Sequence, residues 1–191
     1  MFKELAENGQ APKTLVIACS DSRVDPAILL DTTPGQIFVI RNVANLVPPY
    51  QPNGESYHGT SAALEFAVNH IKVENIVVLG HSKCAGIQAL VDQSTKPTNP
   101  GEFSFISSWV DMASIARDQA ILKHHNTACD DLYHICEKES IIASLKNLET
   151  FPWVKSKLEK NELTLHGWYV SLVDGKLHML SADGFFEEFS E

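Results

Sequence analysis

Three short apolar runs constrain the fold of this chain more than any other feature of its sequence. Each is as long as one strand and has no alternating polar side chains, which is typical of strands buried on both faces. The segments between them carry apolar residues at helical spacing, at 24–30 and 57–71, and another such segment follows at 82–91. Strands that alternate with helices predict an α/β fold with a mostly parallel central β-sheet flanked by helices. The three strands are expected at 14–19, 36–41 and 75–80.

The C-terminal part of the chain predicts an antiparallel hairpin at one edge of that sheet. Asp174-Gly175 is a strong two-residue turn signal between expected strands at 163–173 and 176–180. Gly167 predicts a bulge in the first of these strands. A chain of 191 residues is long enough for one full core, so a single domain over 1–191 is expected.

Composition excludes several classes of function. The 24 acidic residues outnumber the 15 Lys and Arg, which gives a net charge of −9 and no basic stripe for nucleic acid. No apolar stretch approaches the roughly 20 residues that span a bilayer, so no membrane association is expected. Four cysteines do not suggest a disulfide framework, which favours a reducing compartment. We expect a cytoplasmic protein, although a targeting peptide ahead of this start would leave an organelle open.

Two short motifs directly follow the first and third apolar runs. They are Cys19-Ser20-Asp21-Ser22-Arg23 and His81-Ser82-Lys83-Cys84. Ligands of open α/β sheets bind beyond the carboxyl ends of the strands, where both motifs fall. Thiolate and imidazole are zinc ligands, and three protein ligands leave a fourth position for water. The motifs therefore predict a catalytic site for one Zn²⁺, with His81 and Cys84 sharing a helix face through their spacing of three. The alternative is two buried thiols and an incidental histidine.

Asp21 and Arg23 lie in the same loop as Cys19. Residues two apart on an extended segment point the same way, so the guanidinium can hold the carboxylate through two hydrogen bonds and keep it ionised. Beside a metal, such a carboxylate suits accepting a hydrogen bond from bound water. The alternative is a surface ion pair that contributes little.

The remaining cysteines and histidines predict structure rather than chemistry. Cys129 and Cys136 lie seven apart on an expected helix, which is typical of small buried apolar residues. His124, His125 and His134 are expected on a solvated helical face, because no acidic or thiol partner completes a metal site. The sequence has no Cys-x-x-Cys pair, P-loop or Gly-x-Gly-x-x-Gly motif.

Taken together, the two motifs resemble those of the β-class carbonic anhydrases, Cys-x-Asp-x-Arg and His-x-x-Cys. The segments at 34–50, 59–66 and 165–169 are also similar to that family. The resemblance implies that Cys19, His81 and Cys84 bind Zn²⁺, that Asp21 accepts a hydrogen bond from zinc-bound hydroxide, and that Arg23 holds Asp21 in place.

The same resemblance implies a substrate site and an assembly. Gln10 matches a glutamine that donates to the substrate oxygen, and Phe38, Val43 and Phe66 match an apolar pocket for CO₂. Ala85 stands beside the substrate where many members have glycine. In the family this pocket forms where two subunits meet, which implies a homodimer or a dimer-based oligomer. By comparison with the family, we expect a short helical arm before Gln10.

The implied activity is the reversible hydration of CO₂ to bicarbonate and a proton. One alternative keeps the fold and changes the substrate to carbonyl sulfide or carbon disulfide. A second alternative is a non-catalytic module that senses zinc or bicarbonate. The intact Asp21–Arg23 pair argues against the sensor, which would need no acceptor for hydroxide.

Overall fold

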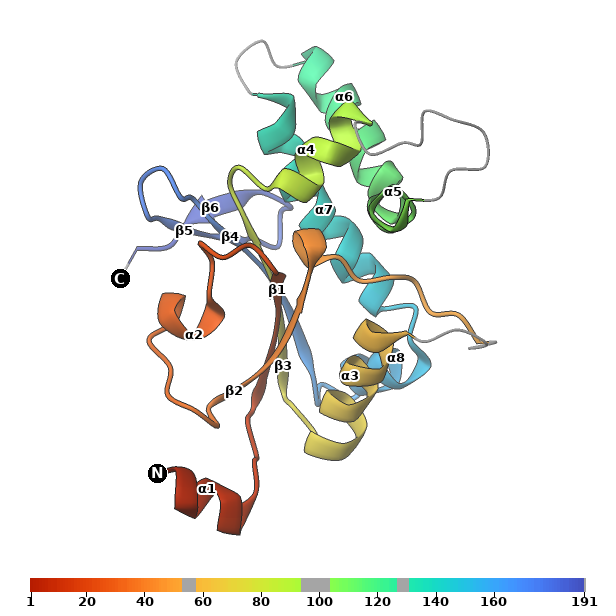
Figure 1. Ribbon diagram of the computed structural model, residues 1–191. Coiled ribbons are helices and arrows are strands. Elements are labelled where there is room, and N and C mark those ends of the chain that lie inside the picture. The colour runs from red at the N-terminus through yellow and green to blue at the C-terminus, as the bar shows by residue number, and fades with distance from the viewer. Residues whose placement is uncertain (53–57, 94–103, 127–130, 191) are drawn as a thin grey trace.

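The computed structural model describes residues 1–52, 58–93, 104–126 and 131–190. Within these residues, six strands form one sheet in the order β2-β1-β3-β4-β5-β6 (Figure 1). The first four strands in that order run parallel, and β5 and β6 pair antiparallel at one edge. This confirms the predicted α/β sheet with its edge hairpin. The strands are β1 (Thr14–Cys19), β2 (Ile37–Asn42), β3 (Asn75–His81), β4 (Thr164–Val170), β5 (Leu177–Leu180) and β6 (Phe186–Glu188).

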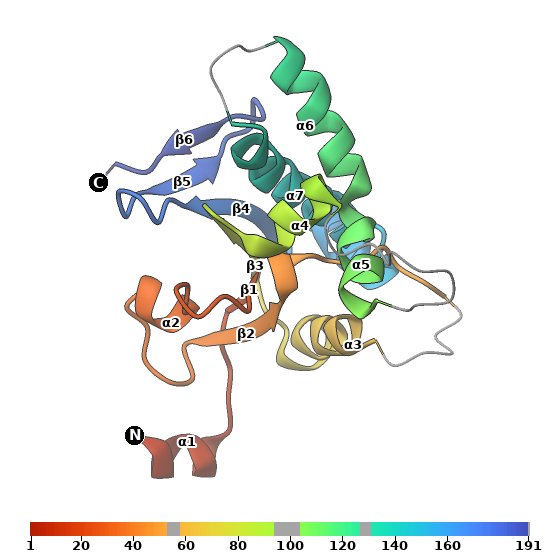
Figure 2. The ribbon, with the colours of Figure 1, turned by 45° about the horizontal axis from the view of Figure 1, so that its top comes forward.

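Helices flank the sheet and gather at two of its sides. One group packs on a single face, and a second group lies beyond the carboxyl ends of the strands, opposite α1 (Figure 2). The first group is α3 (Gly59–Glu65), η2 (Phe66–Ile71), α7 (Leu132–Leu148) and α8 (Pro152–Glu159). The second is α4 (Ala85–Asp92), α5 (Phe105–Val110) and α6 (Ser114–Asn126), together with the start of α7. The remaining helical elements are α1 (Phe2–Asn8), α2 (Pro26–Leu29), η1 (Val43–Asn45) and η3 (Asp111–Ala113).

The central strand β1 is buried on both faces, as its apolar run predicts. Leu15 and Ile17 belong to the core between the sheet and α3, α7 and α8, whereas Val16 and Ala18 belong to a smaller core on the other face. All four side chains are fully buried. Because every side chain of the run finds apolar neighbours, β1 can occupy only an inner position of the sheet.

Gly167 does not form the predicted bulge. Pairing of β3 with β4 continues unbroken through Val78 and Gly167. A Cβ at Gly167 would lie 3.1 Å from both Ile141 Cγ2 and Leu145 Cδ1. The glycine is therefore needed for the close approach of α7 to the sheet, which no local pattern reveals.

Three further features differ from expectation. The run at 36–41 was expected to be buried on both faces, but β2 lies at the edge of the sheet and only Ile40 of its six residues is buried. Strand β6 was not predicted, although Asp183-Gly184, with Gly184 at φ 83°, is a turn signal of the same kind as Asp174-Gly175. The helix expected at 57–71 begins at Gly59 and ends in one turn of π-helix, and residue 57 lies outside the described residues. No helix in the described part of the chain has the length and apolar character needed to cross a membrane.

Candidate metal centre

The three predicted metal ligands meet at the carboxyl ends of two adjacent parallel strands. Cys19 ends β1, His81 ends β3, and β1 pairs with β3 from Thr14 to Ala18. The ligand atoms of Cys19, His81 and Cys84 all lie within 4.8 Å of one another, and all three residues are buried. The parallel register therefore brings together side chains that are 62 and 65 positions apart in the sequence, as 81 − 19 and 84 − 19 give.

His81 and Cys84 do not share a helix face, contrary to the prediction from their spacing. His81 still belongs to the strand, and Cys84 is the residue that precedes the first turn of α4. Between them, Lys83 adopts a left-handed backbone conformation with φ 59°. This turn folds the chain back, so that Cys84 reaches the end of β3 without any helical geometry.

The donor set fits one zinc ion. His81 Nδ1 lies 2.9 Å from the carbonyl oxygen of Ser82, to which it can donate, and this leaves Nε2 as the ligand atom. Nε2 is buried and has no hydrogen-bond partner among the described residues. The two sulfur atoms are 4.0 Å apart, and tetrahedral zinc with bonds of about 2.3 Å to sulfur separates two sulfurs by about 3.8 Å.

The electrostatics of the two thiols favour a divalent cation. The hydrogen bond from Cys84 lowers the pKa of Cys19 to about 4, and the backbone N–H groups of Asp21 and Ala44 also donate to its Sγ. The hydrogen bond to Cys19, together with burial, raises the pKa of Cys84. The surrounding donors therefore favour Cys19 as a thiolate. A bound dication would favour the thiolate form of Cys84 as well, because only thiolates ligate the metal.

Asp21 and Arg23 form a bidentate pair at the mouth of the site. Arg23 Nε donates to Asp21 Oδ1 at 2.9 Å, and Nη2 donates to Oδ2 at 2.6 Å. The hydrogen bonds from Arg23 hold the pKa of Asp21 well below its usual range. Arg23 Nη2 also donates to the carbonyl of Lys83 at 3.0 Å, which ties the two motifs together. Asp21 Oδ2 lies 4.0 Å from His81 Nε2, so this ionised carboxylate faces the metal position.

Comparisons with known proteins agree with this geometry. The profile of the carbonic anhydrase family matches residues 14–177. The solved β-carbonic anhydrase CcaA has a TM-score of 0.88 and 32% identity, with coverage of 100% of this chain and 82% of that chain. The chain belongs to the β-carbonic anhydrase family.

Two other members illustrate how widely the likeness extends. β carbonic anhydrase 5, chloroplastic, from Arabidopsis thaliana is 45% identical over 173 residues, which are 91% of this chain and 55% of that protein. The chain therefore spans about half the length of this curated relative. One of two tetrameric β-carbonic anhydrases from Sordaria macrospora gives a TM-score of 0.78 at 29% identity, with 95% of this chain and 86% of that chain covered.

Arg41 is a family-segment residue whose role the sequence did not reveal. Its Nε donates to the carbonyl of Cys19 at 2.9 Å, and its Nη2 donates to the carbonyl of Asp21 at 2.7 Å. Its Nη1 lies 3.2 Å from Asp25 Oδ2. One guanidinium from β2 thus braces the loop that carries Cys19 and Asp21. The available signal was an arginine near the end of an apolar run, where its fork of donors can meet loop carbonyls.

Of the five residues that match the family's substrate site, Val43 and Ala85 lie beside the metal ligands. Ala85 directly follows Cys84, and Val43 precedes Ala44, whose N–H donates to Cys19 Sγ at 3.4 Å. A Cβ at Gly86 would lie 2.7 Å from Val43 Cγ1, which places Val43 against the first turn of α4.

The other three residues lie away from the metal position of the same chain. Phe38 pairs with Leu15, four positions before Cys19, or about 13 Å along the strand. Phe66 lies with Phe38, at 6.0 Å between ring centroids, and is 45% exposed. Gln10 is exposed and lies in the segment between the end of α1 and the start of β1.

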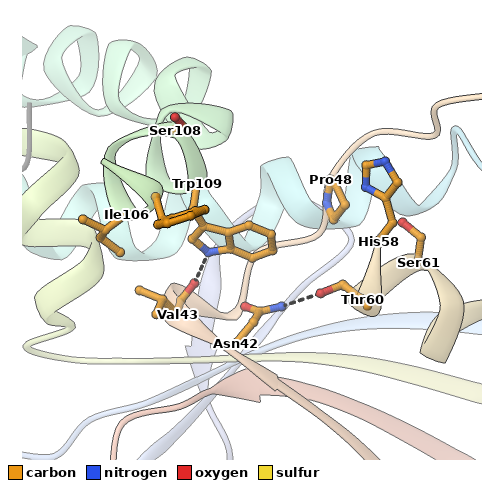
Figure 3. Close-up of a pocket in the computed structure, with 11 residues that line it drawn as sticks. Asn42, Val43, Pro48, His58, Thr60, Ser61, Ile106, Ser108 and Trp109 are labelled. Atoms are coloured by element: carbon orange, nitrogen blue, oxygen red, sulfur yellow. Dashed lines mark hydrogen bonds between the residues drawn. The ribbon is translucent and has the colours of Figure 1, made fainter. Parts of the chain in front are cut away.

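A cavity of about 860 Å³ opens beside Val43 (Figure 3). It lies between α5, η1 and the start of α3, and Trp109 Nε1 donates to the Val43 carbonyl at 2.7 Å across one wall. Asn42 Nδ2 lies 3.3 Å from Thr60 Oγ1 in another wall. None of the three metal ligands lines this cavity.

The remaining cysteine and histidine predictions have mixed outcomes. Cys136 is fully buried in the core around the site, as predicted, whereas Cys129 lies outside the described residues. The His134 side chain is 40% exposed, and its Nδ1 also lies 2.9 Å from the hydroxyl of buried Tyr169, so it is only partly solvated. His124 is exposed, as predicted, and the side chain of His125 lies outside the described part.

Proposed function

We propose that this chain is a zinc-dependent carbonic anhydrase, which catalyses the reversible hydration of CO₂ to bicarbonate and a proton. The observation that carries this proposal is a buried pair of sulfurs and one unpartnered imidazole nitrogen, faced by a carboxylate that Arg23 keeps ionised. A structural zinc site has four protein ligands, whereas this cluster supplies three. The cluster therefore favours a metal with one position left for chemistry.

Each residue of the centre has a distinct role in the proposal. Cys19, His81 and Cys84 would hold one Zn²⁺, which, when bound, supplies a Lewis acid that makes water acidic enough to attack near neutral pH. Ionised Asp21 has no proton to donate, so it accepts a hydrogen bond from the attacking water and directs an oxygen lone pair toward the carbon of CO₂. Arg23 restricts Asp21 to that orientation.

The substrate site is completed, in this proposal, by a second copy of the chain. Val43 and Ala85 come from the chain that holds the metal. The partner would bring Gln10, Phe38 and Phe66, which lie too far from the metal position of their own chain. Gln10 would donate its amide N–H to a substrate oxygen. A homodimer, or an oligomer built from dimers, is therefore the smallest active unit. The tetrameric description of the Sordaria macrospora relatives supports an oligomer.

Two alternatives remain distinct from this function. Carbonyl sulfide or carbon disulfide could replace CO₂ at the same centre, and a zinc or bicarbonate sensor would bind without turnover. The bidentate geometry of Asp21 and Arg23 favours catalysis, because a sensor needs no oriented acceptor. Location in the cytoplasm stays a prediction for this chain, and a plastid is the matching alternative in view of the chloroplastic relative.

Stopped-flow CO₂ hydration by protein of measured zinc content tests the proposal. The zinc-loaded parent should hydrate CO₂, and Asp21→Asn should keep its zinc while its kcat falls by about 10²-fold or more. Asp118→Asn is the matched control, because it removes a carboxylate from the Arg117–Asp118 pair on α6, away from the metal ligands. A zinc-loaded parent that leaves CO₂ unchanged, or an Asp21→Asn variant as fast as the parent, would contradict the proposal. Parallel assays with carbonyl sulfide and carbon disulfide separate the alternative substrates.

A further inference from the structure

A buried carboxylate lies directly behind the metal ligand Cys84. Glu137, on α7, has a side chain that is only 4% exposed. Its Oε1 accepts a hydrogen bond from the backbone N–H of Cys84 at 3.1 Å, and its Oε2 accepts one from the Tyr169 hydroxyl at 2.8 Å. Burying a carboxylate is costly unless its oxygens are satisfied, so both contacts are needed here. None of the catalytic roles assigned above uses this residue.

The loop that Glu137 contacts needs external support. Lys83 holds a left-handed backbone conformation, which is strained for a residue other than glycine. Cys84 precedes the first turn of α4, and its N–H donates to the side chain of Glu137 rather than to a backbone carbonyl. Neighbouring contacts hold the rest of the loop, because Ser82 N–H donates to the Val170 carbonyl at 3.0 Å.

A second layer of hydrogen bonds fixes Glu137 itself. Tyr169 lies on β4 and is 1% exposed, and its hydroxyl donates to Glu137. His134, one helical turn before Glu137, places Nδ1 2.9 Å from the Tyr169 oxygen and can donate to it. The carboxylate is therefore held in one rotamer between α7 and β4, with its second oxygen directed at Cys84.

We propose that Glu137 is a positioning residue for the metal centre: its contact with the Cys84 N–H sets the position of the Cys84 thiolate relative to Cys19 and His81. The inference rests on the metal site of the proposed function. Groups outside the ligand shell that orient metal ligands commonly change metal affinity 10- to 100-fold when removed. Glu137 would act in this way through the backbone N–H of Cys84 and not through the Cys84 side chain.

Zinc affinity, measured by competition with a chromogenic chelator, tests this without any activity assay. Glu137→Ala removes the acceptor and should weaken zinc binding by about 10- to 100-fold. Glu137→Gln keeps an oxygen for the Cys84 N–H, and its amide can donate to the Tyr169 oxygen when the Tyr169 hydroxyl donates to His134 Nδ1 in the tautomer that leaves Nδ1 unprotonated. Its affinity should stay within about threefold of the parent. The absorption spectrum of the Co²⁺-substituted protein should change with Glu137→Ala and not with Glu137→Gln.

Glu139→Ala is the matched control, because Glu139 is also a buried glutamate of α7, 9% exposed, and pairs with Lys123 instead of the metal loop. Parent-like zinc binding by Glu139→Ala supports a specific role for Glu137, even where both alanine variants lower the melting temperature equally. Should Glu137→Ala not fold, Tyr169→Phe replaces it and should weaken zinc binding by about twofold to fivefold.

Three results would overturn the inference: parent-like zinc binding by both Glu137→Ala and Tyr169→Phe, an equal loss in Glu139→Ala, or an equal loss in Glu137→Gln and Glu137→Ala. The last result would mean that the charge of Glu137 matters and its contact with Cys84 does not. A parent protein that binds no zinc is a different outcome, because it overturns the metal site of the proposed function as well.

Discussion

Replacing Gly80 with alanine is expected to separate α7 from the sheet next to the metal ligand His81. A Cβ at position 80 would lie 2.6 Å from Ile141 Cδ1 and 2.9 Å from Ile141 Cγ1. Ile141 is fully buried, so its side chain cannot turn out to solvent. Restoring an ordinary contact of about 3.6 Å requires a shift of about 1 Å, which in a packed core costs about 1–3 kcal/mol of the free energy of unfolding.

The same shift should weaken zinc binding. Ile141 lies one helical turn after Glu137 on α7, so moving the helix lengthens the 3.1 Å contact between Glu137 and the Cys84 N–H. Urea denaturation of the metal-free protein measures the first effect, and chelator competition measures the second. Gly59→Ala is the matched control, because a Cβ there meets nothing within 4 Å and its stability should change by less than about 1 kcal/mol.

A compensating change at Ile141 provides the decisive comparison. Ile141→Val removes the Cδ1 atom that the methyl group added by Gly80→Ala would meet, and by itself should cost about 0.5–1.5 kcal/mol. The loss of free energy of unfolding in the double variant should be about 1 kcal/mol smaller than the sum of the losses in the two single variants. Strictly additive costs, or a Gly80→Ala variant as stable as the parent, would refute the argument that close packing of α7 requires glycine here.

Three further predictions concern the centre itself. Cys84→Ser should lose zinc and CO₂ hydration together, as elemental analysis and stopped-flow assays on the same sample would show; full zinc content would contradict Cys84 as a ligand. Arg23→Ala should keep its zinc, but Asp21 then loses the hydrogen bonds that depress its pKa. Asp21 should therefore protonate at a higher pH, and the acid limb of the pH profile of kcat should shift to higher pH. An unshifted acid limb would argue against the role of the Asp21–Arg23 pair. Gln10→Ala should lower kcat/KM for CO₂ without changing zinc content, and unaltered kinetics would remove Gln10 from the substrate site.

The ligand set was predictable because each ligand follows a strong local signal. Cys19 and His81 both stand at the ends of apolar runs, and a parallel sheet places the ends of adjacent strands together. The position of Cys84 beside Cys19 and His81 depends on the left-handed turn at Lys83. Such a turn is uncommon for a lysine, and the spacing of the motif does not indicate it. Helical spacing therefore predicted three residues that the structure does bring together, although the local geometry that joins them is different.

Contacts between distant segments were not predictable in the same way. Gly167 suggested a bulge because a glycine inside a strand has several possible causes, and only the position of α7 selects among them. Glu137 had no signal at all, since a glutamate on a helix is usually solvated, and its burial follows from the packing of α7 against the metal loop. Arg41 braces the Cys19–Asp21 loop for a similar reason, because the register of β2 with β1 sets its position.

Hydrophobic period and residue chemistry are local properties of the chain, so they were enough to predict the alternation of strands and helices and the three candidate metal ligands. The buried groups that support those candidate ligands, and the substrate-site residues that lie apart from them, became visible only in the folded chain. Both depend on distances between segments far apart in the sequence, and such distances are set by the packing of α7 on the sheet and by the register of the strands.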